Sequence, residues 1–560
     1  MNEFFQRLKL TPGLTLEIGI ASLFANILAL AAPLFVIQVL NRYVAYGVDA
    51  TLLTLTIGVL IAISLEYAFR KIRMRLCRSI SAGPNANIAN ASYNILLKVK
   101  ASALEQIPMG QRQQIISATS SVEKAYGSDN IGTVFDVPFA FLFIAALFFL
   151  SALLSGIVVC FLIGIFITGR INARRLQKNT RKLIQTSGTS NALINSAIAE
   201  IDTVRAFNAS TFLSNIWSTH INRVQNLRGN TEILQGGNQT FIQTATSLMS
   251  VLIISIGATM VVASELDVGA MIGANILATR ALMPVSRFSQ LSASFAEASE
   301  SILILKEFAK LPLESESGSS KETYKGGLEF RDLAFNFPGA RTPLFESLSL
   351  NVKPNTIVVI RGSNGTGKTT LIRLITGIIE PTRGHIFSDG LDLRQASSEW
   401  WRRQFIYLPQ EPSFLNATIR DNLITVNSKI EEQQLLNAVK ASGLKEFFDE
   451  SPLGLETQII DNGKNLSLGI RRRLAMARAL LTDGMLVVFD EPTEGLDREG
   501  VACVYSVLNS LSLRGRTIIV VSHDPKIVKG AHVAIDLDAK PVPKISHRSQ
   551  TANKKTAGKI

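Results

Sequence analysis

The chain has 560 residues, of which 47% are hydrophobic and 18% are charged, and its mean hydropathy is +0.25. This length predicts at least two domains, and this composition argues against a soluble enzyme and favours a membrane protein. The formal net charge of +13 does not predict a nucleic-acid partner, because many basic residues flank apolar runs or lie near the C-terminus.

The N-terminal half contains the long apolar runs. A bilayer core requires roughly 20 mostly apolar residues in a helix, so these runs predict an all-α transmembrane domain of six helices over residues 1–312. The third and fourth helices share one apolar stretch, which is interrupted over 151–156. The predicted spans are about 18–40, 52–69, 138–152, 155–168, 245–263 and 268–285.

Basic residues predict the orientation of these spans, because lysine and arginine are retained on the cytoplasmic side. The segment after the second span contains Arg70, Lys71 and Arg73, and the segment after the fourth span is also basic. Both long loops and both termini are therefore expected in the cytoplasm. The loops contain few helix breakers, so we expect the spans to continue as helices, with a crossing helix at each loop tip.

Arg280 lies inside the sixth predicted span, where an unpaired charge is costly. Two interpretations stay open. The side chain lines a substrate pathway, or it pairs within the helix bundle and has a structural role.

The second half has a different pattern. Residues 313–325 are rich in Ser, Glu and Gly and predict a linker. Short apolar strands then alternate with helices, which predicts an α/β domain over 326–541. The remaining residues, 542–560, are expected to form a basic, disordered tail.

A phosphate-binding loop is predicted between the apolar strand 356–360 and the helical run 370–376. The pattern is GxxxxGK[ST], in which glycines let backbone N–H groups wrap phosphates and the helix N-terminus adds positive potential. Lys368 would reach the β and γ phosphates, and Thr369 would ligate magnesium. The residues expected to bind nucleotide here are Gly362, Ser363, Asn364, Gly365, Thr366, Gly367, Lys368, Thr369 and Thr370.

Two further strand ends carry polar side chains suited to phosphate chemistry. Asp490 and Glu491 follow the apolar run 485–489, and His523 follows the strand 517–521. We expect Asp490 to hold magnesium through water and Glu491 to polarise the attacking water. His523 is expected to touch the γ phosphate, whereas the other four histidines read as structural or solvated.

The order of these motifs resembles that of an ATP-binding cassette (ABC) ATPase. The phosphate loop is followed by Gln410, by a Leu-Ser-Leu-Gly sequence at 466–469, by the two carboxylates, by Asp497 and by His523. The resemblance implies ATP and Mg²⁺ as cofactors, and a second copy of the half-transporter as partner.

The resemblance also implies individual roles. Phe337 would stack on adenine, and Gln410 would ligate magnesium and sense the membrane domain. Ser467 and Gly469 would approach the γ phosphate held by the opposite subunit, and Asp497 would lie in the loop that links the two nucleotide sites.

The first half resembles the membrane domain of type I secretion transporters, through residues 32–36, 135–139 and 280–284. This resemblance implies export of an unfolded polypeptide, with a periplasmic adaptor and an outer-membrane channel as partners and membrane lipid around the helices. An exporter of lipid, drug or small peptide is an alternative, because this architecture serves many substrates.

The signature sequence departs from the family pattern. LSGGQ is replaced by Leu466-Ser467-Leu468-Gly469-Ile470, so leucine stands where glycine would allow a close contact. Either the change is tolerated in an active homodimer, which the presence of Glu491 and His523 favours, or it slows the site that this signature completes. In the second case the chain would be a catalytically impaired, regulatory subunit of a heterodimer.

Overall fold

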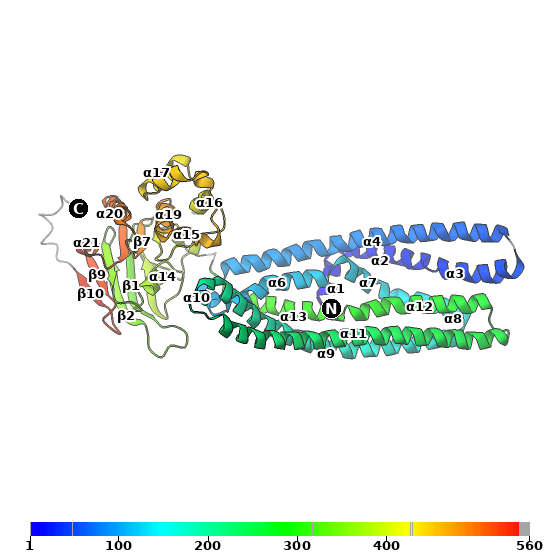
Figure 1. The fold of residues 1–560 in the computed structure, drawn as a ribbon. Coiled ribbons are helices and arrows are strands. Elements are labelled where there is room, and N and C mark those ends of the chain that lie inside the picture. The colour runs from blue at the N-terminus through cyan, green and yellow to red at the C-terminus, as the bar shows by residue number, and fades with distance from the viewer. Residues whose placement is uncertain (1, 48, 316–317, 426, 428, 548–560) are drawn as a thin grey trace. The chain divides into compact units, whose positions relative to one another are not determined.

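The computed structural model describes all residues except 1, 48, 316–317, 426, 428 and 548–560. The described residues form two compact units (Figure 1). One unit comprises residues up to Val99 together with Ala103–Pro312, and the other comprises Lys100–Ser102 and the residues from Leu313 onward.

The first unit is helical (Figure 1). Its elements are α1 (Asn2–Leu10), α2 (Pro12–Leu28), α3 (Ala31–Gln38), the π-helix Val39–Val44, α4 (Asp49–Lys98), α5 (Ala101–Glu105, which begins in the other unit), α6 (Met109–Ala125), α7 (Ser128–Asp136), a 3₁₀ turn (Val137–Phe139), α8 (Ala140–Leu150), α9 (Ala152–Ala199), α10 (Ile201–Ala206), α11 (Ser210–Val262), α12 (Val268–Gln290) and α13 (Ser292–Phe308).

Six helical stretches in the described part of the chain are long and apolar enough to cross a membrane, as the sequence predicted. They continue beyond the predicted spans into the loops, as was also expected from the sequence: α4 has 50 residues and α11 has 53. The third and fourth stretches are separated by one residue, Ser151, rather than by a turn over 151–156. Ser151 has an extended backbone, and its side chain accepts a hydrogen bond from the Leu154 N–H at 3.4 Å, so it ends α8 and caps α9.

The surface of this unit is apolar where a lipid environment is expected. Phe149 is 88% exposed and Phe141 is 74% exposed, which is unfavourable in water and favourable in hydrocarbon. Inside the bundle, small residues let helices approach closely. A Cβ at Gly273 of α12 would lie 2.3 Å from Cγ1 of Ile37 on α3. A larger residue would therefore push α3 and α12 apart.

Arg280 of α12 is partly buried and lines a cavity together with Asn26, Arg70, Asp136 and Arg287. Asp136 accepts a hydrogen bond from Asn26 Nδ2 at 3.0 Å and forms an ion pair with Arg73. Arg280 therefore belongs to a charged cluster that α2, α4, α7 and α12 build together.

The second unit contains two sheets. The antiparallel sheet has the order β2 (Phe345–Val352), β1 (Leu328–Phe335), β4 (Arg383–Ser388), β5 (Leu391–Asp392). The larger sheet has the order β10 (Lys544–His547), β9 (Val533–Asp536), β3 (Ile357–Arg361), β8 (Thr517–Val521), β7 (Leu486–Asp490), β6 (Phe405–Leu408). All its strand pairs are parallel except β10 with β9.

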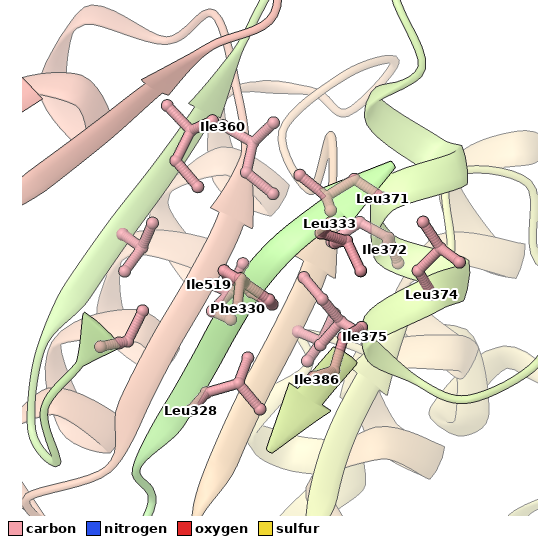
Figure 2. Close-up of a cluster of buried hydrophobic side chains, with 14 of the residues drawn as sticks. Leu328, Phe330, Leu333, Ile360, Leu371, Ile372, Leu374, Ile375, Ile386 and Ile519 are labelled. Atoms are coloured by element: carbon pink, nitrogen blue, oxygen red, sulfur yellow. The ribbon is translucent and has the colours of Figure 1, made fainter. Parts of the chain in front are cut away.

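Helices cover these sheets, which completes the predicted α/β fold. They are α14 (Lys368–Ile375), α15 (Ser398–Arg402), α16 (Ile419–Ile424), α17 (Glu432–Ala441), α18 (Lys445–Glu450), α19 (Leu468–Leu480), α20 (Arg498–Leu513) and α21 (Pro525–Gly530), with 3₁₀ turns at Gly454–Glu456 and Asp461–Gly463. Figure 2 shows side chains of α14, including Ile372 and Ile375, beside Leu333 of β1 and Ile386 of β4. This packing fixes α14 at the end of β3.

Two sequence expectations for this unit need correction. The predicted tail from 542 was wrong at its start, because β10 pairs with β9 and Ile545 packs against the core; residues 548–560 lie outside the described part. The predicted linker 313–325 contains a buried anchor, since the Tyr324 ring centroid lies 5.5 Å from that of Trp401. β10 was not predicted because its surroundings in the sequence are basic, and the anchoring role of Tyr324 was not predicted because the residues before it are rich in Ser, Glu and Gly.

Candidate functional site

The phosphate loop lies between β3 and α14, where the sequence predicted it. Gly365 and Gly367 have φ angles of +79° and +101°, a region that favours glycine. A Cβ at Gly367 would lie 2.4 Å from Leu344 Cδ2, so a larger residue would also require the Leu344 side chain to move. Ser363 and Asn364 are exposed and Thr366 is buried, and the loop leads directly into Lys368, Thr369 and Thr370 at the N-terminus of α14.

Lys368 bends back over this loop. Its Nζ donates to the Gly362 carbonyl at 2.7 Å and to the Ser363 carbonyl at 3.3 Å, and it lies 3.2 Å from His523 Nε2. The ammonium group is therefore positioned at the rim of the loop, where it can exchange carbonyl contacts for phosphate oxygens.

The carboxyl ends of β7 and β8 bring two more groups to the same place, because parallel neighbouring strands end at one edge of the sheet. His523 Nε2 lies 3.4 Å from Glu491 Oε1. Lys368, Glu491 and His523 thus converge, although they are far apart in the sequence.

Glu491 has two unusual properties. Its φ of +44° is uncommon for a residue with a side chain, and such backbone strain concentrates at functional sites. Burial raises the pKa of its carboxyl group, more than His523 and Lys368 lower it. A carboxylate with a raised pKa is a better proton acceptor near neutral pH.

Asp490 is suited to a cation. It is 1% exposed, and neither carboxylate oxygen has a hydrogen-bond partner among the described residues. Burial raises the pKa of Asp490, while the Thr369 hydroxyl and Lys368 lower it to a smaller extent. A buried carboxylate with free oxygens, beside a hydroxyl group, is the kind of oxygen ligand set that Mg²⁺ prefers, so these residues fit the cation.

Gln410 and Phe337 lie at the ends of β6 and β1. Gln410 Nε2 donates to Glu494 Oε2 at 3.2 Å, in the loop that follows Asp490 and Glu491. Phe337 is 49% exposed and packs edge-on against Phe335, with ring centroids 5.1 Å apart. One face of an exposed aromatic ring can stack on a nucleotide base.

The signature residues form a separate feature. The Ser467 side chain caps α19 by accepting from the Ile470 N–H at 3.3 Å, and Leu468 is 39% exposed. Within the described residues, neither Ser467 nor Gly469 is hydrogen-bonded to the phosphate loop. Asp497 caps α20 and pairs with Arg473 at 2.7 Å, which ties its loop to α19.

Three site residues were not predicted from the sequence: Glu494, Arg472 and Asp538. Asp538 Oδ1 accepts the Ser363 N–H at 2.7 Å, and this hydrogen bond holds the pKa of Asp538 below its usual range. Arg472 contacts both the Gln410 carbonyl and Glu494. The position of Asp538 just after a strand was a usable signal, whereas the other two are recognisable only through their neighbours in space.

Comparisons with known proteins agree with this architecture. The family model described as "ABC transporter transmembrane region" matches residues 15–285, and the model described as "ABC transporter" matches residues 345–494. Relatives include the exotoxin translocation ATP-binding protein PaxB of Pasteurella aerogenes, which is 26% identical over 521 residues, 92% of this chain and 72% of that protein. The alpha-hemolysin translocation ATP-binding protein HlyB of Escherichia coli is also 26% identical, over 92% of this chain and 73% of that protein.

A solved structure has the same fold. It is described as a bacterial Atm1-family ABC exporter with ATP bound, and its TM-score with this chain is 0.81 at 18% identity, covering 94% of both chains. The six apolar helical stretches, the two-sheet unit with its phosphate loop and the two family matches lead to one conclusion: this chain belongs to the ABC transporter family.

Proposed function

We propose that this chain hydrolyses ATP to drive export and is the permease and ATPase component of a type I protein secretion system. The observation that carries the ATPase proposal is the convergence of Lys368, Glu491 and His523 at one edge of the sheet. The secretion proposal is supported by toxin translocation proteins that align with 92% of the chain.

In the proposed reaction, the phosphate loop and Lys368 bind the β and γ phosphates of ATP. Mg²⁺, when bound, would neutralise phosphate charge, and Asp490, Thr369 and Gln410 would hold it. Glu491 orients the attacking water and accepts a proton from it, and His523 contacts the γ phosphate. Phe337 stacks on the adenine.

A second copy of the chain would complete each site. Ser467 and Gly469 at the start of α19 would bind the nucleotide held by the partner, so ATP joins the two subunits. Hydrolysis then lets them separate, and this cycle of closure and opening moves the membrane helices. We assign residues 1–312 to the transmembrane domain in the bacterial inner membrane and place the ATPase domain in the cytoplasm.

The helical unit contains a polar cavity. It has a volume of about 680 Å³ and lies among α6, α9, α11, α13 and the C-terminal end of α12. Most of its lining side chains are hydroxyls and amides, and the charged ones are Lys124, Arg228 and Glu297. Such groups can exchange hydrogen bonds with an extended peptide backbone. A periplasmic adaptor and an outer-membrane channel would continue the path.

The substitution Glu491→Gln tests the ATPase proposal. In the purified full-length chain we expect ATP binding to persist while turnover falls by about 10²- to 10⁴-fold, because proton transfer to the base is lost. Glu499→Gln is a matched control, since Glu499 is exposed on the first turn of α20. Parent-like hydrolysis by the Glu491 variant would overturn the assignment of the base.

The cargo is tested in cells. Affinity purification of the Glu491→Gln chain from native membranes should recover a second copy, an adaptor protein and a polypeptide cargo. Recovery of lipid without any polypeptide or adaptor would support the alternative exporter class.

A further inference from the structure

Three elements meet at Gln410. The residue follows β6, Glu494 lies in the loop between β7 and α20, and Arg472 lies on the second turn of α19. The amide Nε2 of Gln410 donates to Glu494 Oε2 at 3.2 Å. Arg472 Nη2 donates to the Gln410 main-chain carbonyl at 3.3 Å and to the same Glu494 oxygen at 3.4 Å. Gln410 is therefore held at both its backbone and its side chain.

The chemistry of this contact selects one orientation of the Gln410 amide. An ionised carboxylate can only accept hydrogen bonds, so it must face the NH₂ group of the amide and not its oxygen. The contact with Glu494 thus leaves Oε1 as the free end of Gln410. A cation is bound by oxygen and never by an amide NH₂ group, so the orientation decides whether Gln410 can be a ligand.

Arg472 fixes the carboxylate in turn. Its side chain is buried, and the Nε and Nη1 atoms have no hydrogen-bond partner in the described part of the chain. A Cβ on Gly495, whose φ is +67°, would lie 3.4 Å from Arg472 Nη1 and 3.2 Å from Leu468 Cδ2. The loop that carries Glu494 therefore lies directly against the start of α19, and glycine at 495 allows this close approach.

We propose that Glu494, held in place by Arg472, is a positioning residue that orients the Gln410 amide so that Oε1 is presented to the cation. The proposal rests on the proposed function, in which Gln410 is a ligand of Mg²⁺. Glu494 acts here as an outer partner of a metal ligand, and removal of such partners commonly weakens metal binding by about 10- to 100-fold.

A purely structural role for Glu494 predicts a different result. The Glu494 side chain is 56% exposed, and exposed ion pairs contribute little to stability. Glu494→Gln keeps the shape of the side chain but adds an NH₂ group, which can donate to Gln410 Oε1 and stabilise the flipped amide. A space-filling role would survive this substitution, whereas an orienting role would not.

The test measures nucleotide binding rather than turnover. The full-length chain in lipid nanodiscs is titrated with Mg²⁺ at fixed fluorescent ATP analogue, and binding of the analogue in EDTA is measured separately. We expect Glu494→Gln and Gln410→Ala each to raise the Mg²⁺ midpoint by about tenfold, with metal-free binding and melting temperature unchanged. Glu499→Gln, which removes the same charge from the same region, should leave the midpoint unchanged.

Each other outcome is decisive. If Gln410→Ala raises the midpoint and Glu494→Gln does not, the orienting role is wrong while Gln410 remains a ligand. If Gln410→Ala has no effect, both the ligand assignment and this inference are wrong. If the unaltered chain shows no Mg²⁺-dependent binding, the proposed ATPase function itself fails. Arg472→Lys keeps a positive charge but loses the guanidinium fork, so a smaller rise in the midpoint is expected.

Discussion

Asp490 shows at the scale of one residue how a functional site costs stability. Its carboxylate is almost fully buried, and its oxygens have no hydrogen-bond partner among the described residues. Without a cation, this group is held in an environment that disfavours its charged form, which is why burial raises its pKa.

The substitution Asp490→Asn should therefore stabilise the nucleotide-free chain. A raised pKa in the folded state means that the folded chain binds the proton more tightly than the unfolded chain does. The free-energy cost of burying the ionised carboxylate is fully present above the raised pKa of the folded chain. It disappears as the pH falls below the pKa of the carboxyl group in the unfolded chain. At pH 7 in EDTA, we expect a higher melting temperature, by about 2–4 °C for each kcal/mol of relieved desolvation.

Thermal melts of both proteins across pH 4–8 check this prediction, with the difference between them shrinking towards acid. The same variant should lose the Mg²⁺ dependence of nucleotide binding. A variant that melts earlier than the parent at neutral pH would show that the carboxylate is stabilising instead.

At the scale of one helix, Leu468 at the start of α19 is the departure from the family's signature sequence. α19 begins at Leu468, whose side chain is 39% exposed, and Ser467 caps the helix. The leucine side chain lies close to Gly495, since a Cβ there would be 3.2 Å from Leu468 Cδ2. In the proposed dimer, this side chain would face the nucleotide bound by the second copy rather than the chain's own phosphate loop.

Replacing this leucine by glycine should raise ATP turnover. Regaining one backbone hydrogen bond to phosphate is worth about 0.5–1.5 kcal/mol, which corresponds to about a two- to tenfold change. Steady-state hydrolysis by the Leu468→Gly chain measures this effect, and Leu468→Met, which keeps the bulk, should match the parent. Equal turnover in all three proteins would mean that the altered signature is tolerated.

Sequence periodicity predicted the existence of the elements better than their extents. The apolar half of α4 was predicted as a span, whereas its polar half, which runs to Lys98, was predicted only as a helical continuation without bounds because it has no hydrophobic signal of its own. The helix continues there because it packs in the bundle through buried residues such as Cys77 and Ile80. β10 was not predicted for a similar reason: it is stabilised by its pairing with β9, a tertiary contact that has no signal in the local sequence.

The candidate site was predictable where a motif coincides with a strand end. Asp490 ends an apolar strand and Lys368, Glu491 and His523 follow apolar strands, and parallel strands place these ends together. Glu494 and Arg472 carry no such signal. Their relation to Gln410 depends on a loop packed against α19, which no local pattern encodes.

At the scale of the whole molecule, the exposed apolar surface of the helical unit must be shielded from water. The native cysteines report on this division: Cys160 of α9 is exposed, Cys77 is buried, and Cys503 in the second unit is partly exposed. A thiol must ionise to react, and hydrocarbon does not allow it to do so.

In sealed inverted membrane vesicles, we expect a charged maleimide to label Cys503 but neither Cys77 nor Cys160. All three should react after unfolding in detergent, as measured by mass spectrometry of the peptides. Labelling of Cys160 in intact vesicles would place this face of α9 in water rather than in lipid.

The length of α4 has a mechanical consequence. At 1.5 Å per residue, 50 residues form a rod about 75 Å long, while the hydrocarbon layer is about 30 Å thick. More than half of the length of α4 is therefore expected outside the hydrocarbon layer. Because the helix is continuous, a small rotation at one of its ends displaces the other end. Pro84, which removes one N–H from the hydrogen-bond ladder, is a point at which this helix can flex.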